Sequence, residues 1–249
     1  MALTYPLDQI RTLAQAQDFP DKFNLYRKLF FLIQNDPKSL YRGCVSVIET
    51  IAISNFIYFY ILQFSKRFFG KNTKNSALLS STFAAVLNTV ITEPLWKAST
   101  VIKMTNSNDS LFQVVYKLAS RDDILSLWSG TRVSLYLVSN PIIQFTIYES
   151  LKSRGNVEGE ISSSRAFFIG AVSKSIATVT TYPLQVAQTR LRIPSNSRKS
   201  MLEILSELFA TQGIEGLFRG CSAKLYQTVL TAAFLFAFYE RLVRIIARK

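Results

Sequence analysis

Tyr182-Pro183-Leu184 is one of three short stretches with a shared pattern, the others being Tyr5-Pro6-Leu7 and Glu93-Pro94-Leu95. Their prolines are 88 and 89 residues apart. A second marker, an aromatic residue followed by any residue and a glycine, comes after each proline: Tyr41-Arg42-Gly43, Trp128-Ser129-Gly130 and Phe218-Arg219-Gly220. The glycines of this marker are 87 and 90 residues apart. Because two independent markers keep one period, we infer three copies of one structural unit.

Long apolar runs flank these markers. They cover residues 77–92 and 166–182 before the prolines, and residues 44–62, 131–151 and 221–246 after the glycines. Each run is close to the roughly 20 residues that a helix needs to cross a bilayer. The runs contain the ionisable residues Glu49, Arg132, Glu149, Lys174, Lys224 and Glu240. Ionisable residues in membrane spans face a bundle interior or a water-filled cavity, so we predict an all-α membrane protein.

The alternative is a soluble helical repeat protein whose charged residues form a solvated face. The length and apolar character of the runs favour the membrane protein. Between the runs, residues 22–35, 109–120 and 198–212 are basic or mixed in charge, with apolar residues at helical spacing. They predict short helices that lie in the membrane interface.

The composition excludes several kinds of chemistry. Histidine is absent, which removes Ser-His-Asp and Cys-His catalysis and the commonest metal ligand. The two cysteines, Cys44 and Cys221, form no CxxC pair, and no glycine-rich phosphate loop is present. We therefore expect no catalytic residues, no metal site and no prosthetic group.

The chain is both apolar and basic. Hydrophobic residues make up 49% of its 249 residues, and 29 Lys and Arg against 16 Asp and Glu give a net charge of +13. Such a chain suits an anionic ligand or an anionic membrane surface. Nucleic acid is the alternative partner, but the basic residues are spread along the whole chain without a binding motif. We expect a lipid bilayer as a partner and no nucleic acid.

Pro6-Leu7-Asp8-Gln9-Ile10-Arg11 has the pattern Pro-x-acid-x-x-base, and with the threefold period it resembles the mitochondrial carrier family over the whole chain. The resemblance implies repeats at residues 1–67, 76–154 and 162–249. It also implies a threefold pseudo-symmetric bundle of six helices with short interfacial helices. Five residues precede Pro6, against a largely apolar run of 16 residues before the second proline, so we expect the first helix to be truncated.

Further stretches resemble the peroxisomal membrane branch of this family, among them Pro94-Leu95-Trp96, Asn140-Pro141 and the segment at residues 223–233. This resemblance implies exchange of nucleotide substrates such as CoA, FAD, NAD, ATP and AMP across the peroxisomal membrane by alternating access. One alternative is a mitochondrial inner-membrane carrier for NAD, FAD, folate or pyrimidine nucleotides, and another is a truncated membrane protein that transports nothing. We expect a monomer, with a receptor that imports peroxisomal membrane proteins as a candidate partner.

The resemblance also implies a gate at each mouth of the bundle. At one mouth Asp8 and Arg11 match the family pattern. The later repeats place other residues at the same two positions, namely Trp96 with Ser99 and Gln185 with Gln188. We expect packing by Trp96 and hydrogen bonds from the glutamines in place of a full ring of ion pairs, and hence a weak gate. At the other mouth the pattern aromatic-acid-x-x-base assigns gating roles to Glu149, Lys152 and Glu240.

Substrate contacts in this family lie about two helical turns beyond each marker glycine, which implies roles for Thr50, Leu137 and Gln227 and for the neighbouring Val138. The apolar pair suits the face of an adenine ring, and Gln227 can form hydrogen bonds. Lys174 and Lys224 can hold phosphates as point charges. The simpler explanations are helix packing for the apolar pair and snorkelling to the interface for the two lysines.

Overall fold

The computed structural model describes residues 4–16, 34, 37–69, 74–105, 109–121, 124–153 and 163–247. For residues 38, 74, 75, 77, 78, 163, 236 and 239–247 it describes the backbone only. Every regular element in this part of the chain is a helix, and no strand occurs in it. The all-α prediction is therefore confirmed.

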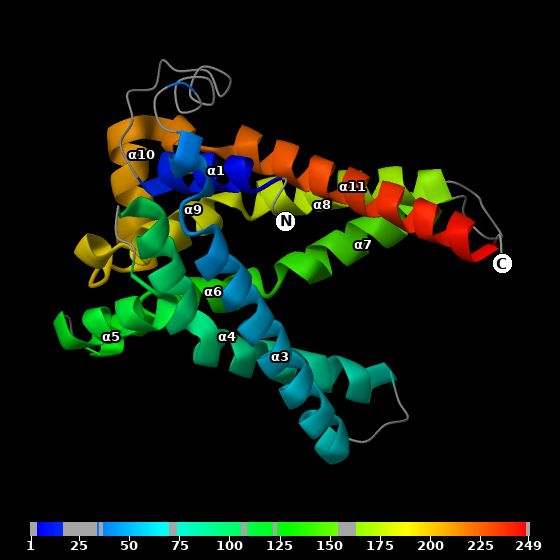
Figure 1. Ribbon diagram of the computed structural model, residues 1–249, viewed down its shortest axis with the longest axis horizontal. Coiled ribbons are helices and arrows are strands. Elements are labelled where there is room, and N and C mark those ends of the chain that lie inside the picture. Colours follow the sequence, from blue (N-terminus) through cyan, green and yellow to red (C-terminus); the bar gives the residue numbers. More distant parts are fainter. Residues whose placement is uncertain are drawn as a thin grey trace.

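The helices fall into three successive groups along the chain, one for each repeat (Figure 1). Repeat 1 contains α1 (Tyr5–Ala16), the 3-10 helix η2 (Pro37–Tyr41) and α3 (Cys44–Phe69). Repeat 2 contains α4 (Lys74–Met104), α5 (Leu111–Arg121), η3 (Ile124–Trp128), α6 (Thr131–Leu137) and α7 (Asn140–Ser153). Repeat 3 contains α8 (Ser163–Thr180), α9 (Tyr182–Leu191), η4 (Pro194–Asn196), α10 (Met201–Leu217) and α11 (Cys221–Ala247). The predicted shortening of the first helix stays a prediction.

Two of the predicted surface helices are present as α5 and α10. Ser200 fixes the start of α10, because its hydroxyl accepts a hydrogen bond from the Glu203 backbone N–H while the Glu203 carboxylate accepts one from the Ser200 N–H. This reciprocal arrangement is a capping box, and it satisfies two backbone donors that the first helical turn leaves without partners. The third predicted surface helix, at residues 22–35, lies outside the described residues apart from Gln34.

The run at residues 131–151 forms two helices, and the prediction of one continuous span is wrong. Helix α6 ends at Leu137, and α7 begins just before Pro141. Proline has no N–H to donate to the Leu137 carbonyl four residues earlier, and its ring crowds the preceding turn. The same effect separates α8 from α9 at Thr181, two residues before Pro183.

Helix α4 instead continues through Pro94, and the marker tryptophan of the same repeat explains why. Pro94 cannot donate a hydrogen bond to the carbonyl of Val90. The indole N–H of Trp128 donates to that carbonyl at 2.7 Å. The backbone acceptor is therefore satisfied, which matters most where lipid excludes water.

Replacing Trp128 by Phe keeps an aromatic ring but removes this hydrogen bond. We expect Trp128→Phe to lower the free energy of unfolding by about 1–3 kcal/mol, because the Val90 carbonyl loses its donor. Thermal unfolding of the purified protein in detergent measures the change. Tyr116→Phe on the exposed face of α5 is the control, and equal melting shifts for the two variants would contradict the assignment.

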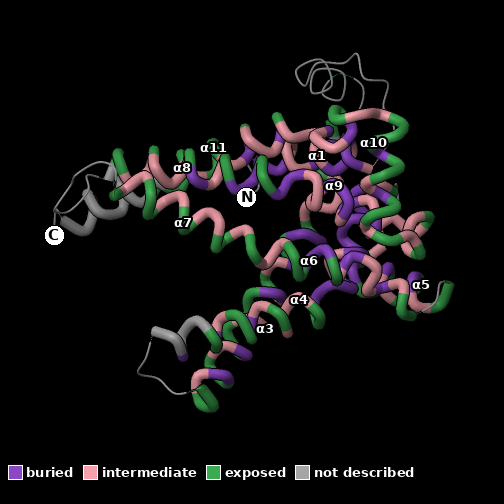
Figure 2. Tube along the Cα trace, turned by 180° about the vertical axis from the view of Figure 1, so that it is seen from behind, coloured by how far each residue is buried: buried purple, intermediate pink, exposed green. Residues whose placement is uncertain are grey.

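Buried apolar side chains form three small clusters. One joins α9 and α10 to α6, a second joins α4 to α5 and η3, and a third joins α1 to η2 and α11. The third cluster connects the last helix of the chain to the first and so closes the bundle. Figure 2 shows the buried residues gathered at the end where α1, α6 and α9 meet, with α3, α7 and α8 extending away from it.

Helix α3 exposes many large apolar side chains and buries several small polar ones. Its exposed large apolar side chains are Val45, Ile48, Phe56, Phe59, Tyr60, Phe64, Phe68 and Phe69. Its buried side chains include Ser46, Thr50, Ser54 and Ser65. This distribution suits a helix that contacts lipid outside and pairs with other helices through small polar residues. Among the described residues, the helical segment Ser39–Phe69 alone is long and apolar enough to cross a bilayer, by length and composition.

Candidate functional site

In repeats 1 and 3 the residue before the proline ties its helix to the marker that follows. The Tyr5 hydroxyl donates to the Arg42 carbonyl at 2.6 Å, and the Tyr182 hydroxyl donates to the Arg219 carbonyl at 2.9 Å. Each tyrosine ring also stacks on the aromatic ring of its marker. This close approach requires glycine, since Gly220 has a φ of +80° and a methyl group there would lie 3.2 Å from the Tyr182 hydroxyl. The ties fix the spacing between the two long helices of a repeat.

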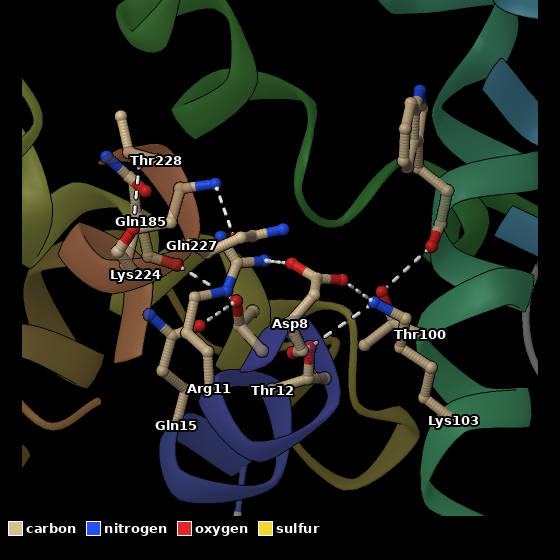
Figure 3. Close-up of polar contacts among 12 residues, drawn as sticks. Asp8, Arg11, Thr12, Gln15, Thr100, Lys103, Gln185, Lys224, Gln227 and Thr228 are labelled. Carbon is tan, nitrogen blue, oxygen red and sulfur yellow. Dashed lines mark hydrogen bonds and ion pairs between the residues drawn. The ribbon is translucent and has the colours of Figure 1, made fainter. Parts of the chain in front are cut away.

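Charged residues join α1 to α4 at the buried end of the bundle (Figure 3). Asp8 forms an ion pair with Lys103 and a second one, at 3.3 Å, with Arg11 in the next turn of α1. The Lys103 ammonium also donates to the Thr12 hydroxyl at 3.4 Å. The Gln9 side chain donates to the Lys103 backbone carbonyl at 2.8 Å. These charge-assisted hydrogen bonds hold the two helices in one register.

A second ion pair joins α4 to the end of α9. Arg192 donates from Nε to Glu93 Oε1 at 2.8 Å and from Nη2 to Glu93 Oε2 at 3.2 Å. The Ser134 hydroxyl donates to Glu93 Oε2 at 2.7 Å, and Gln188 donates to the Ser134 hydroxyl at 2.6 Å. Because the Glu93 side chain is only 1% exposed, its charge depends on these partners.

Hydrogen bonds join α9 back to α1. The Gln15 side chain donates to the Tyr182 hydroxyl at 2.9 Å and accepts from the Thr189 hydroxyl at 2.8 Å. Arg190 Nε donates to the Gln15 backbone carbonyl at 2.9 Å. Helices α1, α4 and α9 are therefore linked in a cycle, which we call the inter-repeat cycle. Ion pairs cross two of its three contacts.

The sequence prediction of a weak gate at this mouth left out three charged residues, Glu93, Lys103 and Arg192. In the described cycle, ion pairs cross two of the three contacts, and repeats 2 and 3 do supply charge. The signal was present in the sequence, because Lys103 and Arg192 lie four residues beyond Ser99 and Gln188. Residues four apart share a helix face.

At this mouth, the three residues of repeats 2 and 3 that we predicted to form the gate, Trp96, Gln185 and Gln188, differ in what they contact. Gln188 makes a hydrogen bond between helices, to Ser134. Gln185 instead donates to Thr181, one turn earlier in its own repeat, at 3.2 Å, so the expected bond between helices is not seen. Trp96 lies beneath the guanidinium of Arg192, 5.8 Å from the ring centroid. Trp96 therefore holds a cation, in addition to the packing expected of it.

The predicted gate at the opposite mouth stays a prediction. Glu149 is exposed on α7, and Lys152 on the same helix is half-buried. Neither forms an ion pair with a residue whose side chain the structure describes. The side chain of Glu240 lies outside the described residues.

A cavity of about 410 Å³ lies between α4, α6 and the end of α9. Its lining includes Leu137, Val138, Trp96, Gln188, Glu93 and Arg192. Two predicted substrate contacts, Leu137 and Val138, and two predicted gating residues, Trp96 and Gln188, thus line the same cavity. The volume lies in the range of pockets that bind small molecules.

The remaining predicted substrate contacts lie elsewhere. Thr50 is fully buried, with its hydroxyl 2.6 Å from that of Ser99, so it serves the contact between α3 and α4 and does not line the cavity. Lys174 on α8 donates to the Asn140 side chain at 3.0 Å. On α11, Lys224 donates to Gln227, three residues later, at 3.2 Å.

Lys224 belongs to a mostly cationic group of side chains in the interior. Figure 3 shows it close to Arg11, with Asp8 and Lys103 beyond. Within this group Asp8 forms ion pairs with both Arg11 and Lys103. Asp8 is the single carboxylate in this group, which we call the cationic group. Positive charge in excess of negative charge favours an anionic ligand.

Binding of this kind needs no covalent chemistry. Among the described residues, no three or more Cys, Asp or Glu side chains come together as metal ligands. Cys44 and Cys221 are both free thiols and are half-buried. The interior therefore offers hydrogen bonds, charge and apolar surface to a ligand.

Fold and site together define a class of protein: an all-α membrane protein made of three repeats around a polar, positively charged interior. The sequence profile described as "Mitochondrial carrier protein" matches residues 1–73, 74–156 and 159–249. The chain belongs to the mitochondrial carrier family. Members of this family are transporters and not enzymes.

Named relatives cover most of the chain. It is 35% identical to "Peroxisomal membrane protein PMP34" of Mus musculus, over 97% of this chain and 87% of the relative. It is 28% identical to "Peroxisomal adenine nucleotide carrier 1" of Glycine max, over 96% of this chain and 85% of the relative. It is also 28% identical to "Mitochondrial nicotinamide adenine dinucleotide transporter 1" of Saccharomyces cerevisiae, over 94% of this chain and 70% of the relative.

The pairing of Asp8 with Lys103 and Arg11 can be tested through stability. We expect Asp8→Asn to lower the free energy of unfolding by about 3 kcal/mol, because a largely buried ion pair loses one partner. The matched control is Asp109→Asn, which breaks the exposed pair with Lys117 and should cost less than about 1 kcal/mol. Thermal unfolding in detergent compares the two. A cost for Asp8→Asn no larger than that of the control would show that the cycle does not depend on this pair.

Proposed function

We propose that this chain exchanges adenine nucleotide-type cofactors, such as CoA, FAD, NAD, ATP and AMP, across the peroxisomal membrane by alternating access. The observation that carries the proposal is the cationic group around Lys224, in which the one carboxylate, Asp8, pairs with Arg11 and Lys103 and leaves Lys224 in excess (Figure 3). Each of these cofactors carries phosphate, whose charge complements the surplus. The names of the mouse and soybean relatives, a peroxisomal membrane protein and a peroxisomal adenine nucleotide carrier, support the same conclusion.

The cavity provides a place for the adenine ring. Leu137 and Val138 offer it an apolar surface, and Trp96 offers an aromatic ring. Such a lining can cover the flat face of a base, while a few polar groups fix its orientation. Lys174 and Lys224 hold the phosphates in this arrangement, because an ammonium acts as a compact point charge that an anion can approach from several directions.

The inter-repeat cycle closes one mouth of the bundle. Cargo leaves at this mouth only when the Asp8–Lys103 and Glu93–Arg192 pairs separate, since they join the three helices that meet there. Transport then alternates between a state with the cycle closed and a state with it open, around a binding site that stays in place. We assign closure of the opposite mouth to Glu149, Lys152 and Glu240.

The protein acts in this proposal as a monomer without a prosthetic group. A receptor that imports peroxisomal membrane proteins delivers it to its membrane. The second candidate function is NAD transport across the mitochondrial inner membrane, which the yeast relative favours. Imaging of the tagged chain against markers of the two organelles distinguishes these candidates.

Exchange in liposomes tests the transport function. Liposomes that contain the full chain and internal AMP should take up labelled CoA, FAD, NAD, ATP or AMP saturably. We expect the double variant Lys174→Ala/Lys224→Ala to reduce the initial rate at least about tenfold, since a hydrogen bond to a charged group contributes about 1.5–3 kcal/mol.

The matched control is Lys199→Ala, which removes an exposed lysine that pairs with Glu207. This variant should exchange at the rate of the unchanged chain. If folded, inserted protein shows no exchange with any of the five substrates, the transport proposal fails. If the double variant matches the control, the assignment of the phosphate contacts fails while transport stands.

A further inference from the structure

Repeat 2 breaks the symmetry of the three repeats at the position before the proline. This position holds Tyr5, Glu93 and Tyr182 in the three repeats. The tyrosines donate to a backbone carbonyl of their own repeat, and a carboxylate cannot donate in this way. Glu93 packs instead against Gly130, where a methyl group would clash with its Oε1 atom, and it binds Arg192 of repeat 3.

The guanidinium of Arg192 lies between two partners. On one side it forms the bidentate pair with Glu93, and on the other it lies over the ring of Trp96. All three residues line the cavity that also receives Leu137 and Val138. The Arg192 side chain remains 13% exposed, whereas the Glu93 side chain is almost completely buried.

A guanidinium recognises carboxylate and phosphate through the same geometry. Its parallel N–H donors form two hydrogen bonds to two oxygens of either group. A phosphate that enters the cavity can therefore take the place of Glu93 on Arg192. Glu93 then keeps the hydrogen bond from Ser134, which is in turn held by Gln188.

The geometry points to a second phosphate-binding subsite, formed by Arg192 and Trp96, in which the Glu93 carboxylate occupies the position that a substrate phosphate takes. This inference rests on the proposed transport of nucleotides and adds a subsite at the cavity between α4, α6 and α9. Because the same carboxylate joins α4 to α9, a phosphate bound to Arg192 also opens one contact of the inter-repeat cycle. Ligand binding thereby favours the open state of this mouth.

The matched control is Glu207→Gln, which removes one negative charge from the exposed pair of Lys199 and Glu207 outside the cavity. If Glu93 only braces the helices, neutralising it should change the binding of AMP and of adenosine alike. If Glu93 competes with phosphate, its neutralisation should strengthen binding of AMP and leave binding of adenosine unchanged.

Titration calorimetry with AMP on the purified full chain in detergent tests the subsite, with adenosine as the uncharged probe. We expect Glu93→Gln to bind AMP at least about fivefold more tightly than the unchanged chain, the lower end of the range for coupled binding sites. Glu207→Gln should show no gain, and the affinity for adenosine should stay the same in both variants. No gain for AMP in Glu93→Gln, an equal gain in Glu207→Gln, or an equal gain for adenosine in Glu93→Gln overturns the inference.

Arg192→Lys keeps the positive charge but removes the parallel N–H donors of the guanidinium. It therefore tests the subsite even if Glu93→Gln fails to fold. We expect weaker binding of AMP and unchanged binding of adenosine, and unchanged binding of AMP overturns the inference. Failure of the subsite and failure of transport are separable. A chain that exchanges AMP in liposomes but shows neither effect contradicts the subsite alone, and one that shows both effects but exchanges nothing contradicts transport alone.

Discussion

The inter-repeat cycle among α1, α4 and α9 is the constraint on which the rest of the structure depends. Apolar clusters also join the repeats, since one packs α6 against α9 and α10 and another packs α1 against α11. Buried polar groups constrain this packing more strictly, because a group such as the Glu93 carboxylate is costly to bury without partners. Each helix in the cycle supplies the partners that another needs. The cycle also sets which helices must separate before a ligand can pass.

Proline creates the second requirement of this fold, since each proline leaves a backbone carbonyl without its usual donor. The repeats meet it in different ways. In repeat 2 the indole of Trp128 donates to the carbonyl that Pro94 leaves free, and α4 continues. In repeat 3 the helix divides at Thr181 into α8 and α9. The same sequence signal therefore gives a continuous helix in one repeat and two helices in another.

The interior of the bundle also carries more positive than negative charge. The cationic group around Lys224 contains one carboxylate, Asp8, which is already engaged by Lys103 and Arg11. An anionic ligand is the natural complement of the remaining charge. The departure from threefold symmetry at Glu93 suits the asymmetry of the proposed ligand. An asymmetric ligand, with a base at one end and phosphate at the other, needs different contacts on different repeats.

The sequence by itself determined the threefold repeat, the all-α class and the family. These follow from the spacing of Pro6, Pro94 and Pro183 and from the apolar runs, which are local or periodic features. The resemblance to the family implied substrate contacts at Leu137 and Val138, and the structure places both at the cavity between α4, α6 and α9. Only the tertiary structure showed that Lys103 and Arg192 form ion pairs between helices, and that Glu93 replaces a tyrosine tie with one of them. An ion pair between residues 99 positions apart, such as Glu93 and Arg192, depends on how helices from two repeats pack, and no pattern along the chain encodes that distance.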